Sequence, residues 1–225
     1  MMPTHKTYDG IPADLTLEKA QEWMRPRISP KRYNHVQGVA KVAHELAIAA
    51  GCDPFLAELA GWLHDACKET KDRDLVIQAL QFGLQLSALD KVNGNLLHGP
   101  VGAETIKRDL NVTNLLVLDA IREHTLGAVQ MTVMSKVVFL ADCLEASRPT
   151  DYTDPIWEAL NRSASKKSEK KAKKGSEALD LDLAILTACD LGLRQLLDSS
   201  RVIHPKTVDV RNYYLALIRE RDKQV

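Results

Sequence analysis

Apolar residues recur every three or four positions along most of the chain, which is the spacing of one face of an α-helix. The first long run begins at Ser29-Pro30, a pair typical of a helix start, and stops at Gly51, where glycine favours a left-handed end. Asp53-Pro54 repeats the start signal ahead of a second apolar run. The same spacing predicts further helices over about 74–82, 100–110, 131–144, 177–197 and 207–221, with two more beginning at a Thr113 cap and at Asp154-Pro155.

Signals for β-strands are missing from the sequence. Alternating runs of β-branched residues joined by hairpin turns do not occur, and aromatic residues make up only 5% of the chain. We therefore predict an all-α fold. A chain of 225 residues can bury one sizeable core. We expect a single domain over residues 1–225, with an N-terminal extension at about 1–15 and a mobile Lys-rich insertion at about 161–178.

The charge balance narrows the range of partners. Thirty Lys and Arg residues are matched by thirty Asp and Glu residues, so a whole-surface attraction to nucleic acid or anionic lipid is not expected. No stretch approaches 18 uncharged apolar residues, which argues against a membrane partner. The four cysteines form no CxxC pair, and the first thirty residues hold no apolar signal segment. We expect reduced thiols and a cytoplasmic protein.

The segment 161–178 departs from this balance. It holds six Lys and one Arg against two Glu, and it has no large apolar residue. Such a composition favours a solvated loop, because there is little surface to bury against the entropy of ordering. The alternative is an electrostatic tether for RNA or another polyanion. We expect at most weak binding of nucleic acid there, since aromatic residues that could stack on bases are absent.

Six polar residues stand at helix ends or among apolar residues, where an unsatisfied polar group costs free energy. The pair His64-Asp65 ends the apolar segment LAELAGWLHDACK, and Asp142 lies within VVFLADCLE. The full set is His35, His64, Asp65, His98, His124 and Asp142. Imidazole and carboxylate groups suit iron, manganese, zinc or cobalt, and facing helices of a bundle can bring them together. Periodicity alone leaves open a set of satisfied surface or capping histidines.

His35, the pair His64-Asp65 and Asp142 resemble the H…HD…D signature of HD-domain phosphohydrolases, and His98 and His124 resemble the additional histidines of the two-metal subset. More narrowly, six segments resemble the YqeK family in their order and spacing: RYNHVQGVA, GWLHDACK, LLHGPVGAE, IREHTLG, KVVFLADCLEASR and HPKTVDVRNYYL. The resemblance covers about residues 20–155 and 178–218. It implies an HD-domain helical bundle and a symmetrical bis(5′-nucleosyl)-tetraphosphatase, which takes a dinucleoside polyphosphate substrate and hydrolyses diadenosine tetraphosphate to two ADP.

The same resemblance implies two divalent or mixed-valence transition metals. The ligands of one metal are matched by His35, His64, Asp65 and Asp142, and those of the second by Asp65, His98 and His124, with Asp65 bridging. Iron is the indicated metal, and manganese or cobalt are alternatives. Two such cations can share a hydroxide that attacks a phosphorus atom of the substrate.

Further residues match substrate positions of the family. Lys68 and Arg148 match residues that hold phosphate, the first as a point charge and the second as a planar fork. Together with Asp65 they are the expected catalytic residues, and an ordinary surface position is the alternative for each of the two cations. Thr125 and Gly127 follow His124 and are expected to let the backbone approach the substrate.

Other functions stay open at this stage. A nucleotidase or a cyclic-nucleotide phosphodiesterase on the same scaffold would share the metal and phosphate chemistry. A nucleotide- or RNA-binding protein with a structural or sensory site is a third alternative. The sequence does not decide the oligomeric state, and a homodimer stays open.

Overall fold

The computed structural model describes residues 7–162 and 179–223, and over these ranges the chain is all-α without a strand, which confirms the predicted fold class. The Lys-rich insertion therefore falls almost wholly outside the described residues. The helices are α1 (Leu17–Met24), α2 (Pro30–Ala50), α3 (Pro54–Leu63), α4 (Asp72–Gln81), α5 (Ala88–Val92), the 3₁₀ turn η1 (Gly94–Leu97), α6 (His98–Leu110), α7 (Leu115–Glu123), α8 (Val133–Leu144), α9 (Thr150–Leu160), α11 (Leu181–Asp198) and α12 (Pro205–Lys223).

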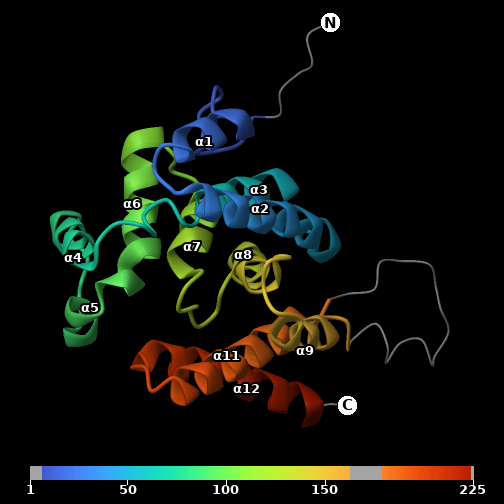
Figure 1. The fold of residues 1–225 in the computed structure, drawn as a ribbon. Helices are drawn as coiled ribbons and strands as arrows, with labels where there is room; N and C mark the ends of the chain where they lie inside the picture. The colour runs from blue at the N-terminus through green and yellow to red at the C-terminus, as the bar shows by residue number, and fades with distance from the viewer. Residues whose placement is uncertain (1–6, 163–178, 224–225) are drawn as a thin grey trace, which may run out of the picture.

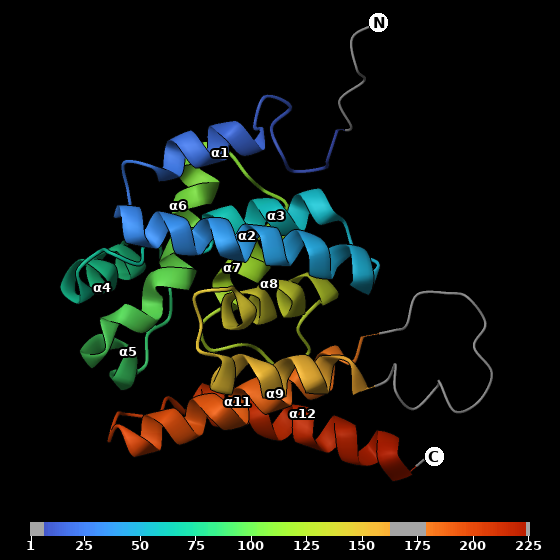
Figure 2. The same ribbon diagram turned by 45° about the vertical axis from the view of Figure 1, so that its right-hand side comes forward.

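The helices are stacked in layers (Figure 1). Helices α2 and α3 lie side by side beneath α1, and α7 and α8 occupy the middle of the molecule. Helices α9, α11 and α12 form the layer on the other side of α8, while α4 and α5 stand at one flank (Figure 2). The ends of α2, α3, α6, α7 and α8 are thereby brought towards the middle of the stack.

The two clearest start signals of the sequence are confirmed. Ser29 Oγ accepts a hydrogen bond from the Arg32 amide, and α2 stops at Gly51, which has a φ of 73°. Asp53 Oδ1 accepts hydrogen bonds from two amides of the first turn of α3. These caps depend only on local residues, which is why the sequence alone predicts them.

Two other predicted starts are wrong. Helix α7 is capped by Asn114, whose side chain accepts from the Val117 amide, and the amides of Thr113 and Asn114 both donate to the Gly10 carbonyl, at 2.7 and 3.0 Å. Helix α9 begins at Thr150, and Pro155 lies inside it. A proline there removes one helical hydrogen bond, and the burial of neighbouring apolar side chains of α9 against α8 and α11 offsets that loss.

A close approach of α2 and α3 sets the spacing of the core. A Cβ atom added to Gly61 of α3 would lie 2.7 Å from the Cα atom of Ala40 in α2. Since real Cβ atoms do not come that close to backbone, only glycine permits this packing. His35 lies in α2, and His64 and Asp65 directly follow α3. The separation of the two helices therefore also sets the positions of three of the six predicted ligands.

We expect Gly61→Ala to destabilise the protein by about 1–3 kcal/mol, because the new methyl group must push two packed helices apart. The midpoint of urea unfolding measures the change. Gly192→Ala in α11 is the matched control: an added Cβ there meets no atom within 4 Å, so the same substitution should stabilise by roughly 0.5–1 kcal/mol. A Gly61→Ala protein as stable as the control would show that α2 and α3 separate freely.

Candidate metal centre

The six predicted ligands come from five helices and converge on one point. His35 lies in α2, His64 and Asp65 follow α3, His98 opens α6, His124 follows α7, and Asp142 lies in α8. His64, Asp65, His98 and His124 are buried, while His35 and Asp142 are partly buried. Helix ends separated by up to a hundred residues of sequence thus place imidazoles and carboxylates together.

Asp65 stands at the centre of this cluster. Its Oδ2 atom lies 3.5 Å from His64 Nε2 and 3.7 Å from His35 Nε2. Its other oxygen, Oδ1, lies 3.4 Å from His98 Nε2 and 3.5 Å from His124 Nε2. Each carboxylate oxygen therefore faces a different pair of histidines, which is the arrangement a bridging ligand requires.

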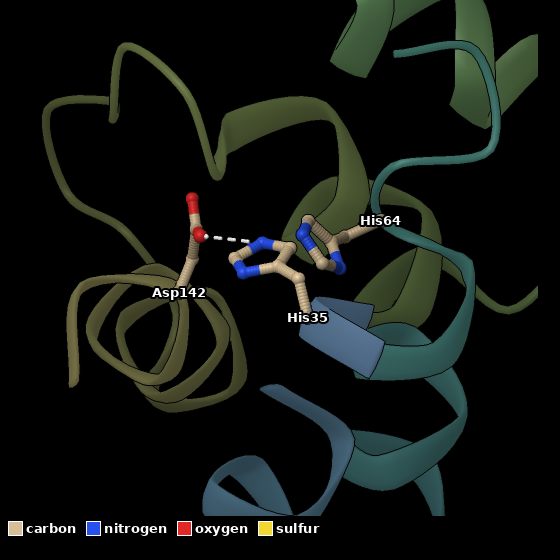
Figure 3. Close-up of side chains that lie close together, drawn as sticks. All are labelled: His35, His64 and Asp142. Carbon is tan, nitrogen blue, oxygen red and sulfur yellow. Dashed lines mark ion pairs between the residues drawn. The ribbon is translucent and has the colours of Figure 1, made fainter. Parts of the chain in front are cut away.

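Asp142 completes the first of these two groups. Its Oδ1 atom lies 3.1 Å from His35 Nε2, and Figure 3 shows this ion pair with His64 beside it. His35, His64 and Asp142 each offer a donor atom within 4.8 Å of the other two, and the same holds for His64, Asp65 and His124. The spacing of both groups is suited to a metal ion.

The imidazole rings are fixed from behind. Three of the four histidines use Nδ1 to bond the backbone carbonyl three positions earlier, and the bonds run from His64 to Gly61 (2.7 Å), from His124 to Ile121 (2.7 Å) and from His98 to Asn95. A carbonyl oxygen only accepts, so each Nδ1 carries a proton, and Nε2 is the ring nitrogen that faces the cluster. Metal-ligating histidines are held in this way.

Two of the four Nε2 atoms lack a hydrogen-bond partner within the described chain. The Nε2 atoms of His98 and His124 lie 3.0 Å apart, with Thr125 Oγ1 at 3.0 and 3.1 Å from them and Lys68 Nζ at 3.5 Å from His98 Nε2. In His35 and His64, Nε2 is buried without a hydrogen bond in the part of the chain that the structure describes. A cation at each group would satisfy these nitrogens, so the donor set fits a metal.

The ionisation of the cluster favours cations. Burial alone would raise the pKa of Asp65, but His64 and the other histidines around it hold that pKa well below its usual value. Burial opposes ionisation of Asp142 as well, and the His35 imidazole beside it lowers the pKa nevertheless. Burial lowers the pKa of His124 to about 4. Near neutral pH, both carboxylates are charged and His124 is a neutral ligand.

The predicted phosphate-binding cations lie at the rim of the cluster. Lys68 Nζ is 3.5 Å from His98 Nε2, and burial lowers the pKa of this amine. Arg148 donates from Nη2 to Asp142 Oδ1 at 2.6 Å and from Nε to the Asp142 carbonyl at 3.0 Å, so its predicted contact with phosphate would fall to the remaining N–H groups. Gly127 packs against Val210 of α12, so its predicted contact with substrate stays a prediction.

Two charged residues of the centre escaped the sequence analysis. Glu145 Oε1 lies 3.0 Å from His35 Nδ1, where the other histidines have a backbone carbonyl. Arg32 donates to Asp65 Oδ2 at 3.0 Å. Both follow a helical spacing that could have revealed them, because Glu145 is three residues after Asp142 and Arg32 is three residues before His35.

We expect Glu145→Ala to lower the affinity for metal roughly 10- to 100-fold, since His35 loses the acceptor that orients its ring. Glu145→Gln keeps an oxygen acceptor and should retain part of the affinity. Competition with a chelator measures the change. The matched control is Glu58→Gln, because Glu58 pairs with Nδ1 of His44 at 2.8 Å outside the centre. Equal affinities for Glu145→Ala and the wild type would contradict a role in orienting His35.

The comparisons with known proteins agree with this geometry. The sequence profile of the HD domain matches residues 32–147, a range that contains all six converging side chains. The chain therefore belongs to the HD-domain family, whose members bind divalent metals, and it is a metal-dependent HD-domain phosphohydrolase.

Curated relatives narrow the family further. The chain is 30% identical over 202 residues to the symmetrical bis(5′-nucleosyl)-tetraphosphatase of Staphylococcus aureus, covering 89% of this chain and 95% of the relative. It is 34% identical over 142 residues to the protein of that name from Bacillus subtilis, covering 63% and 76%. Within the HD-domain family, the chain belongs to the symmetrical bis(5′-nucleosyl)-tetraphosphatases, which confirms the resemblance drawn from the sequence.

A solved structure extends the likeness to the whole fold. The crystal structure of a predicted HD superfamily hydrolase involved in NAD metabolism, from Clostridium acetobutylicum, superimposes with a TM-score of 0.76 at 26% identity. The superposition covers 90% of this chain and 98% of the Clostridium acetobutylicum chain. Separately, none of the described helices is both long and apolar enough to cross a lipid bilayer.

Proposed function

We propose that this chain hydrolyses diadenosine tetraphosphate symmetrically, giving two ADP, with a pair of iron ions as its metals. The observation that carries the proposal is the position of Asp65, whose two oxygens face separate histidine pairs. Relatives from Staphylococcus aureus and Bacillus subtilis are named for this activity. Four imidazoles and two carboxylates suit iron, and the same donors would accept manganese or cobalt.

The overall step adds one water across the central P–O–P bridge. The water oxygen forms a new bond to one inner phosphorus, and the bridging oxygen leaves with the other ADP. When bound, the two metals would supply positive charge against the phosphate oxygens and a lowered pKa for a shared water. His35, His64, His98 and His124 orient this chemistry through their fixed Nε2 atoms.

The chain adds its own cations and donor around the reacting phosphates. Lys68 supplies a mostly buried amine beside His98, and Arg148 supplies a fork beside Asp142. Thr125 places a hydroxyl within 3.1 Å of two histidine nitrogens. Charge that builds up on the phosphate oxygens during the reaction would thus meet groups already in place.

Incubation with diadenosine tetraphosphate should give ADP as the main product, because the water attacks an inner phosphorus and the central bridging oxygen leaves. Chromatography of the products measures this outcome. AMP and ATP in equal amounts would contradict symmetrical cleavage. Faster turnover of dAMP or of a cyclic dinucleotide under the same conditions would instead favour a nucleotidase or a phosphodiesterase.

The same preparation tests the cofactor. Elemental analysis of freshly purified protein should give close to two metals per chain, with iron in excess over manganese and cobalt. Protein that is free of metal and fully active would overturn the proposal.

A further inference from the structure

Two separate clefts reach the candidate metal centre. The first, here called the α11 cleft, has a volume of about 870 Å³, is formed by α8, α9 and α11, and includes His124 and Asp142. The second, the α2 cleft, has a volume of about 590 Å³ and lies between the start of α2 and the segment that joins α8 to α9. It reaches the centre at His35. Both volumes are within the range of roughly 300–1,000 Å³ that is usual for small-molecule sites.

The two clefts share part of their lining beside the centre. Arg148 and Pro149 line both of them. Arg148 is also the residue whose guanidinium is bonded to Asp142 at 2.6 Å. A molecule that extends from one cleft into the other would therefore pass Arg148, between His124 and Asp142 of the α11 cleft and His35 of the α2 cleft.

We propose that the two nucleoside diphosphate halves of the substrate occupy different clefts, one in the α11 cleft and one in the α2 cleft, with the scissile bridge between them at the metal centre. This inference rests on the proposed function. With the central bridge held between the two clefts, each cleft would keep one diphosphate after cleavage.

The walls of the α11 cleft suit a nucleoside. Tyr152 and Leu191 provide aromatic and apolar surface for a base, as small-molecule sites generally do. Arg194 and Arg201 line the same cleft and are exposed, so their charges are free to approach phosphate oxygens. The α11 cleft therefore offers apolar surface and cationic groups within one site.

The α2 cleft is more polar and carries its own cations. Lys31 and Arg32 line it together with Arg148, and Asn34 is exposed on its wall. Its two carboxylates are already engaged: Glu69 accepts hydrogen bonds from the Ser29 amide and hydroxyl at 2.7 and 2.5 Å, and Glu145 is bonded to His35. Arg32 and Arg148 are themselves paired with Asp65 and Asp142, and Lys31 is exposed on the same wall. The scarcity of apolar wall indicates that this half would be held mainly through its phosphates and ribose.

The test blocks each cleft in turn. Asn34→Trp fills the α2 cleft from an exposed position of α2. Gly192→Trp fills the α11 cleft, where an added Cβ meets no atom within 4 Å, so the backbone need not move. Equilibrium dialysis of metal-loaded protein against labelled ADP then counts bound ADP per chain. The wild type should bind two ADP, each single variant one, and the double variant none, with turnover of diadenosine tetraphosphate lost in every variant.

Tryptophan placed elsewhere on the same helices provides the matched controls. Lys41→Trp in α2 and Leu197→Trp in α11 lie at exposed positions outside both clefts and should bind two ADP. Circular dichroism and metal content, unchanged in all variants, show that the fold and the centre are intact. Saturation of the wild type at one ADP, or an Asn34→Trp protein that binds and turns over like the wild type, would overturn the two-cleft assignment. Production of ADP by the wild type separately decides the proposed function.

Discussion

Replacing Asp65 by asparagine should remove both metals from the chain and abolish hydrolysis with them. The substitution keeps the shape of the side chain, but it removes the negative charge and one of the two oxygens that face separate histidine pairs. Residues that only support metal ligands contribute roughly 10- to 100-fold to affinity, so a shared ligand should contribute more than that. The metal content measured by elemental analysis and the turnover of diadenosine tetraphosphate should therefore fall together.

The control for this variant is Asp182→Asn. Asp182 pairs with Lys136 at 2.5 Å in a partly buried ion pair away from the centre, so the same chemical change should leave the metal content at two. If Asp65→Asn protein retained two metals, a bridge by the Asp65 carboxylate would not be needed to hold them. A variant that kept one metal would show that only one histidine pair depends on Asp65.

Replacing Arg148 by lysine should lower kcat/KM by about 10- to 150-fold, although the positive charge is preserved. Arg148 uses Nε and Nη2 to hold the carbonyl and carboxylate of Asp142, so its predicted contact with phosphate would fall to the remaining N–H groups. A lysine cannot do both, because its ammonium is a point charge without a planar fork. The loss of one hydrogen bond to a charged group, worth about 1.5–3 kcal/mol, gives the expected range.

Metal content should be retained in Arg148→Lys protein, which separates loss of phosphate binding from loss of the centre. Arg211→Lys is the matched control, since Arg211 pairs with Asp190 at 2.7 Å and lines neither cleft. Near-normal kinetics for Arg148→Lys would assign the phosphate grip to another cation, with Lys68 the next candidate.

The sequence predicts those parts of the fold that depend on neighbouring residues. The starts of α2 and α3 follow from a cap and a proline, and both are confirmed. The start of α7 was predicted one residue early, because Thr113 and Asn114 are adjacent and both are good N-caps, and the contact with Gly10 that fixes this segment comes from about a hundred residues away in sequence. Helix α1 carried no prediction, and it buries only Ala20 and Met24, so its apolar pattern is faint.

The candidate site also has parts that the sequence predicts and parts that it does not. Polar residues among apolar ones pointed to the six converging side chains, but periodicity could not show that they meet. Glu145 was missed because a glutamate at a helix end is usually solvated, whereas here it is buried against His35. The two clefts were beyond sequence reasoning altogether, since each is built from segments far apart along the chain.

The spread of the six converging side chains over five helices has a consequence for the unfolded chain. The four cysteines are free, so no disulfide restrains the unfolded ensemble. A metal pair held by residues that range from His35 to Asp142 would act as a cross-link in their place, closing a series of loops of roughly 20 to 30 residues each. Because a cross-link of this kind lowers the entropy of the unfolded state, the metals would contribute to the stability of the whole helical stack as well as to the reaction.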